Sequence, residues 1–165
     1  MKKAILVLPF AMLAAGSVFA QTCASPIEVT SNNSNGAFAA PGATTCGAGN
    51  NIDPFPGGAA SPQQEIVYSF VANNADATIS IDSSGGALQP GLVVMNACNE
   101  TAEIVAVADS AAPGPIQAQV SGLTNGATYY VVVTSRIGAP DDNCGPFTGT
   151  IAGELPVSLQ NFSVE

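Results

Sequence analysis

The sequence predicts an all-β protein, an antiparallel sandwich of two sheets held by disulfides. Short apolar or alternating segments recur at intervals of about 8 to 12 residues, the strand spacing of such sandwiches. Turn-forming residues separate these segments, and the 165-residue chain contains 17 Gly and 12 Pro. After residue 20 no segment has the period of a helix, so we expect none.

The first 20 residues are expected to be a secretory signal peptide and not part of the fold. Lys2 and Lys3 precede an apolar run over residues 4–15, and residues 18–20 provide a signal peptidase site. The run is too short to span a bilayer comfortably, and no second one follows. We therefore expect an exported chain without membrane insertion, with one sandwich domain over residues 21–152.

Residues 21–62 are irregular and rich in Asn, Gly and Pro. They have room for two short edge strands, over residues 26–30 and 36–40. A loop of this length would be held in place by a disulfide, because cross-linking removes conformational freedom. An unstructured arm is the alternative.

Five strands are expected between residues 65 and 120. Residues 65–72 alternate between two side-chain sets, and residues 73–76 have the composition of a hairpin loop leading to the strand 78–82. That strand has Ile79 and Ile81 on one face and polar residues on the other, as in a half-buried strand. The remaining three strands are expected over residues 91–96, 103–108 and 116–120.

The strongest strand pattern covers residues 128–134, where every residue is β-branched or aromatic. Asn125 and Gly126 precede it and suit a tight hairpin or a corner. Its two faces are Tyr129, Val131 and Val133 on one side and Tyr130, Val132 and Thr134 on the other. Because both faces are largely apolar, we expect a central strand.

The last strand of the sandwich is expected over residues 147–152. Residues 153–165 follow it and include an alternating segment, Leu-Pro-Val-Ser-Leu-Gln-Asn-Phe-Ser-Val-Glu, over residues 155–165. This segment resembles the junction before a carboxy-terminal sorting tail, and it would serve equally as a final edge strand.

The four cysteines, Cys23, Cys46, Cys98 and Cys144, lie after the expected signal peptide. An even number in an exported chain predicts two disulfides. Of the three possible pairings we expect Cys23 with Cys46 and Cys98 with Cys144, because the first closes a local loop. Zinc is the competing interpretation, but the chain has no His and no CxxC pair.

The charge balance argues against two classes of partner. The chain has 3 basic and 12 acidic residues, and Arg136 is the one cation after residue 20. Nucleic acid is not expected as a partner, because its binding requires many Lys and Arg to neutralise phosphates. An anionic membrane surface is disfavoured for the same reason.

Several segments carry a resemblance to a known family. They are Cys46-Gly47, residues 65–70 (Glu-Ile-Val-Tyr-Ser-Phe), residues 123–130 (Leu-Thr-Asn-Gly-Ala-Thr-Tyr-Tyr) and residues 144–148 (Cys-Gly-Pro-Phe-Thr). Together they resemble the bacterial pre-peptidase C-terminal domain, which implies a small jelly-roll-like sandwich accompanying secreted enzymes as a non-catalytic module. The spacing of Leu123 and Tyr129 also resembles the tyrosine corner of fibronectin type III domains, an alternative within the same architecture.

Catalytic chemistry finds little support. Without His, the Ser-His-Asp and Cys-His mechanisms are excluded. Asp141 with Asp142, or Glu100 with Glu103, are formal candidates for a glycosidase pair. Adjacent acids in a Pro- and Gly-rich loop are more often solvated, and no Trp is present for sugar stacking.

Calcium is the one cofactor with some support, because it binds hard oxygen donors from loops. The candidate ligands are Asp53, Glu65, Asp109, Asp141 and Asp142, with Asn143 beside them. They lack the spacing of an EF-hand, and solvated loop carboxylates are the preferred interpretation.

The function expected from these observations is structural and not enzymatic. We expect a secreted component of the bacterial cell surface or extracellular matrix, adhesive or self-assembling through its C-terminal segment, with itself or another extracellular protein as partner. The alternative is an accessory module that binds calcium, an extracellular protein or a glycan beside secreted hydrolases. An enzyme of unrecognised type is a third hypothesis.

Overall fold

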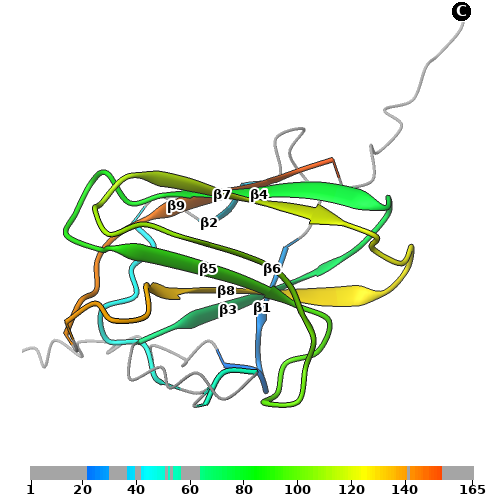
Figure 1. The fold of residues 1–165 in the computed structure, drawn as a ribbon, viewed down its shortest axis with the longest axis horizontal. Helices are drawn as coiled ribbons and strands as arrows, with labels where there is room; N and C mark the ends of the chain where they lie inside the picture. Colours follow the sequence, from blue (N-terminus) through cyan, green and yellow to red (C-terminus); the bar gives the residue numbers. More distant parts are fainter. Residues whose placement is uncertain are drawn as a thin grey trace, which may run out of the picture.

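The computed structural model describes residues 22–29, 37–39, 42–50, 52, 54–56, 64–140 and 142–153. Within these residues it contains nine strands and no helix (Figure 1). The strands are β1 (Ile27–Glu28), β2 (Ala37–Ala39), β3 (Ile66–Val71), β4 (Asp76–Asp82), β5 (Pro90–Met95), β6 (Ile104–Asp109), β7 (Pro115–Ser121), β8 (Thr128–Ser135) and β9 (Thr148–Ala152). Each strand expected within these residues is present, with ends that differ by at most two residues.

The strands form two stacked sheets, as Figure 1 shows. The five-stranded sheet has the order β1-β3-β8-β5-β6, and the four-stranded sheet has the order β2-β9-β4-β7. All pairs are antiparallel except β1 with β3. The predicted all-β antiparallel sandwich with disulfides is therefore confirmed, and β8 is the central strand of its sheet.

The prediction of a hairpin loop over residues 73–76 is wrong. β3 pairs with β8 in the five-stranded sheet, whereas β4 pairs with β7 and β9 in the other sheet. The connection crosses between layers and is tied to the neighbouring corner, where Gly126 N donates to Ala72 O over 2.8 Å. Crossovers and hairpins use the same turn residues, so the local sequence does not separate them.

The second corner, between β7 and β8, also crosses between sheets. Gly126 has a φ of +83°, a left-handed conformation that glycine adopts without strain. Three residues further on, the Tyr129 hydroxyl oxygen accepts a hydrogen bond from Thr124 N over 3.0 Å. This contact has the geometry of a tyrosine corner, in which the phenol ties a strand to the backbone just upstream.

The main core fills the space between the sheets. Tyr68 lies at its centre, with its ring centroid 4.8 Å from that of Phe38 and 6.4 Å from that of Phe147. Burial raises the pKa of the Tyr68 phenol far above its ordinary value, because the ionised form would lose its hydration. Gly149 is required here, since a Cβ at that position would lie 2.4 Å from the Phe38 ring.

A second apolar cluster lies on the outer face of the five-stranded sheet. Val67, Met95 and Val132 point outward from three strands and are buried under Ile52 and Phe55 of the irregular segment. The covering segments, which we define as residues 22–25, 52 and 54–56, thus form a partial third layer. This layer explains why both faces of β8 are apolar.

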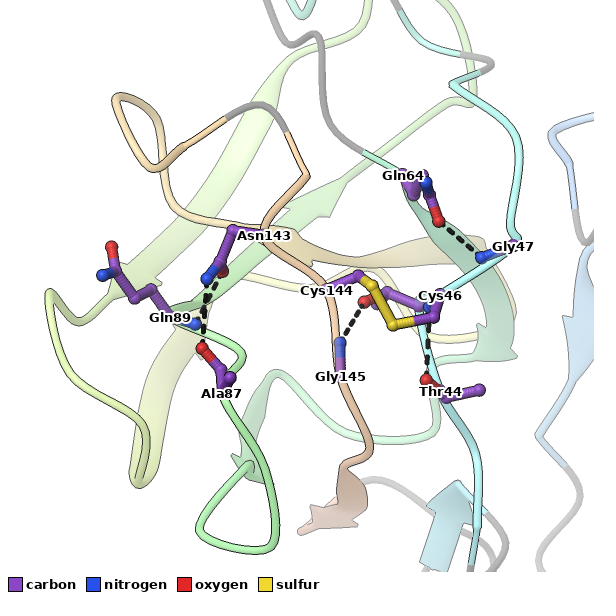
Figure 2. Close-up of a disulfide and its surroundings, with 10 residues drawn as sticks. Thr44, Cys46, Gly47, Gln64, Ala87, Gln89, Asn143, Cys144 and Gly145 are labelled. Atoms are coloured by element: carbon purple, nitrogen blue, oxygen red, sulfur yellow. Dashed lines mark hydrogen bonds between the residues drawn. A yellow bond between two sulfur atoms is a disulfide. The ribbon is translucent and has the colours of Figure 1, made fainter.

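The disulfide pairing expected from the sequence is wrong. The structure pairs Cys23 with Cys98 and Cys46 with Cys144, with Cα atoms 5.3 and 4.9 Å apart. Cys23 and Cys46 are close in sequence, but the fold carries residue 23 across the outer face to the end of β5. The pairing of the cysteines therefore follows their proximity in the fold and not their proximity in sequence. Figure 2 shows the second bridge joining the segment before β3 to the segment before β9.

Candidate binding groove

The covering segments leave part of the outer face of the five-stranded sheet open. A groove of about 300 Å³ lies there, over β5, β6 and the end of β8. We call it the β6 groove. The lining residues used below are Phe55, Val93, Ile104, Val107, Arg136 and Ile137. Phe55 belongs to the covering segments, so the groove begins where the third layer ends.

Exposed apolar side chains concentrate in this groove. Ile104, Val107 and Ile137 are 40%, 65% and 64% exposed. They account for three of the four large hydrophobic side chains that are exposed among the described residues, the fourth being Val71. A contiguous apolar surface on a folded protein marks an interaction site more often than an isolated exposed residue does.

The backbone of the groove floor is shaped by Gly91. A Cβ at this position would lie 2.9 Å from the carbonyl oxygen of Ser135, so a larger residue would push β5 and β8 apart. Arg136 follows directly, and its backbone N donates to Gln89 O over 2.8 Å. The end of the groove is therefore fixed by main-chain contacts.

Charge in the groove is confined to its Arg136 end. The guanidinium Nη1 of Arg136 lies 3.9 Å from a carboxylate oxygen of Asp109, with the two side chains 33% and 55% exposed. A pair this long and exposed stabilises the fold little. The Nε of Arg136 is buried and has no hydrogen-bond partner within the described structure. That Nε is out of reach of a ligand, but the guanidinium has four further N–H donors and only the long pair to Asp109, so it can bind a further carboxylate.

The strand beside the groove is an open edge. β6 is the last strand of its sheet, and its outer backbone groups find no strand partner in the part of the chain that is described. Natural edges are commonly guarded by Lys, Pro or an inward charge. β6 has neither Lys nor Pro, and its guards are a bulge near Met95 and Asp109 at its end.

The predicted calcium ligands are dispersed. Glu65 is fully buried and accepts a hydrogen bond from Ile52 N, which anchors the covering segments. Asp109 belongs to the groove and Asp142 is exposed, while Asp53 and Asp141 lie outside the described residues. In the part of the chain that the structure describes, no three His, Cys, Asp or Glu residues gather as a metal-ligand set.

Asn143, the remaining predicted oxygen donor, has a structural contact. Its side-chain oxygen accepts from Gln89 N over 2.8 Å, and its side-chain nitrogen donates to Ala87 O over 3.0 Å (Figure 2). Both bonds hold the loop that leads into β5 beside the Cys46–Cys144 bridge. The other formal pair, Glu100 and Glu103, lies in and after the exposed turn that follows β5.

Sequence reasoning missed the groove itself. The sequence identifies Arg136 as the one cation after residue 20, but it does not show that Val107 and Ile137 lie beside it. One pattern could have indicated them: residues 104–108 have no polar side chain on either face, which is unusual for a strand that lies at an edge.

No protein-family model, curated protein or solved structure matches this chain. None of the described segments forms a helix that is long and apolar enough to cross a membrane.

Proposed function

We propose that the protein is a secreted, non-enzymatic β-sandwich that serves as a structural or adhesive component of the bacterial cell surface or extracellular matrix. In this proposal it associates with itself through residues 155–165. The observation that carries it is the exposed apolar groove along the open β6 edge. An edge of this kind favours pairing with a strand from another chain.

Two further features support an extracellular role. The disulfides close long loops, with sequence separations of 75 and 98 residues, and are compatible with an oxidising compartment. Residues 1–20, which lie outside the described residues, have the pattern of a signal peptide. Both fit a protein that must stay folded outside the cell.

The chemistry of the groove supports binding over catalysis. Its charged groups are Asp109 and Arg136, which lie against each other. The hydroxyl of Thr134 donates to the Gln64 carbonyl over 3.2 Å. With no His in the sequence, a nucleophile in the groove would lack the usual general base.

The proposal is tested by sedimentation of the exported chain with and without residues 157–165. Every contact described above lies outside the removed segment, so the truncated chain should fold. We expect concentration-dependent association of the longer form in the micromolar range and a monomer after truncation. A monomeric longer form at all these concentrations would overturn the proposal.

The second candidate is an accessory module that binds another extracellular protein. The same groove favours it, because an apolar surface ending in an arginine would also accept an apolar, acidic segment from a secreted hydrolase. Co-purification of a hydrolase from the culture fluid with a monomeric full-length chain would support this candidate. Assembly of the purified chain into filaments would contradict it.

A further inference from the structure

We infer that the β6 groove is the acceptor site for residues 155–165 of a second copy of this chain, which add a strand to the β6 edge. The inference rests on the proposed function and goes further, because it names the surface that receives the segment. Three observations support it: the open edge, the charge at the groove end and the place where β9 ends.

The edge and the segment match in character. β6 pairs with β5 on one side only, so the backbone groups on its outer side are available to a further strand, and its own Ile104 and Val107 side chains are exposed. Residues 155–165 contain Val157 and Leu159, which share one face of an extended strand, and Phe162, which lies on the other face. In strand addition, backbone hydrogen bonds hold the added strand while alternate side chains enter the groove.

The charges match as well. Arg136 is 33% exposed and has only a long ion pair to Asp109. The donor region contains Glu154 and Glu165 and no basic residue. Either direction of the added strand places one of these glutamates on the Arg136 side of the groove, and the register of pairing decides whether it reaches the guanidinium. A guanidinium can bind two carboxylates because it has five donors.

The position of β9 favours a segment from a second copy over the chain's own. β9 ends at Ala152 in the four-stranded sheet, where the Asn74 side chain donates to Gly153 O. The groove faces outward from the other sheet. Reaching it means crossing β4 and β7 and then the thickness of the sandwich, about 25 Å and thus roughly seven or eight extended residues. That path would consume most of residues 154–161, which then could not line the groove.

This arrangement joins unlike surfaces, the tail of one copy to the groove of the next. Such contacts propagate into a filament when they run on from copy to copy, and they close into a dimer when two copies exchange tails. Both forms of association depend on the tail.

The test compares a charge in the groove with the same charge on the opposite face. Val107→Glu alters an exposed groove residue, and Thr150→Glu is the matched control on the exposed face of β9. Both positions are exposed, so both variants should fold and keep their disulfides. We expect Val107→Glu to weaken association by at least roughly tenfold, and Thr150→Glu to leave it unchanged.

A second arm uses a synthetic peptide of residues 154–165 and the chain truncated after residue 156, measured by fluorescence anisotropy. We expect binding that is lost with Val107→Glu and weakened several-fold, with less salt dependence, by Arg136→Gln. Equal binding to the parent and to Val107→Glu would overturn the acceptor assignment.

The outcomes separate the two proposals. Tail-dependent association that Val107→Glu does not affect would overturn the acceptor site and leave the proposed function standing. A monomeric full-length chain overturns the proposed function. The peptide binding of this full-length monomer is then compared with that of the truncated chain. Binding to the truncated chain alone would mean that the chain's own segment occupies the groove, and the second-copy inference would be wrong.

Discussion

The outer faces of the two sheets differ in almost every respect. On the four-stranded sheet the outer face is polar, and its side chains bond to one another: Thr78 donates to Gln119, and Gln117 donates to Ser80, over 2.9 and 3.2 Å. On the five-stranded sheet most of the outward positions are apolar, Ser69 and Thr134 being exceptions, and Val132 is fully buried beneath the covering segments. The outer face of the four-stranded sheet contacts water, whereas much of the outer face of the five-stranded sheet is covered by protein.

The difference shows what a partial third layer requires. The covering segments have almost no regular structure, so few ladder bonds hold them on the sheet. They are instead fixed by the Cys23–Cys98 bridge and by the buried Glu65 carboxylate, which accepts from Ile52 N. Beyond Phe55 the cover ends, and the β6 groove remains as the uncovered part of the same apolar face.

The largest effect on the covered outer face is expected from removing the Cys23–Cys98 bridge by substituting both cysteines with Ala. We expect a loss of about 2–5 kcal/mol in the free energy of unfolding, because the unfolded chain regains the freedom of a long loop. The outer apolar cluster should also become accessible to a hydrophobic dye. Removing Cys46–Cys144 is the control: a similar loss of stability is expected, without dye binding at the outer face. Unchanged dye binding in the first variant would contradict the role of the bridge.

A smaller test exchanges the same two side-chain types on the two faces. Val132→Thr places a hydroxyl in the covered cluster and should cost about 1–3 kcal/mol, because the new polar group loses its hydration. Thr150→Val on the exposed face of β9 should change stability by less than about 0.5 kcal/mol. Denaturant unfolding measures both, and equal effects would show that the covering segments do not exclude water.

The interior between the two faces should respond to high pH through Tyr68. Its pKa in the folded protein is raised above the ordinary value of 10.0 because the phenol is buried. Below pH 10 the phenol is protonated in both the folded and the unfolded chain, so it contributes its full stabilisation. Above pH 10 the unfolded chain loses the proton first, and the free energy of unfolding falls by about 1 kcal/mol between pH 10 and pH 11. Tyr68→Phe should flatten this part of the profile, and an unaltered slope would contradict the assignment.

The smallest effect concerns the polar outer face. The Ser84 hydroxyl and backbone N both donate to Asp82, and these bonds lower the pKa of the Asp82 carboxyl below 3.8. The associated stability is present above that value and is lost as pH falls through the lowered pKa. An NMR titration should find the pKa of Asp82 raised toward 3.8 in Ser84→Ala. Identical values in the two proteins would show that the bonds are not formed in solution.

Local sequence was sufficient to predict the strands and the fold class. The period of two in residues 78–82 and the β-branched run at 128–134 place strands within two residues of those observed, because strand formation depends on which faces a segment can bury. The tyrosine corner was also predictable, since Leu123, Gly126 and Tyr129 lie within one turn and its following strand.

Only the tertiary structure decided how these strands are joined and what lies outside them. The pairing of Cys23 with Cys98, the assignment of β3 and β4 to different sheets and the opening beside Val107 all depend on contacts between residues distant in sequence. The alternation of residues along a strand shows whether one of its faces is apolar. Whether that face meets a second sheet, a loop or an open groove depends on the packing of the whole chain. Alternation therefore determined the strands, and long-range packing determined the groove.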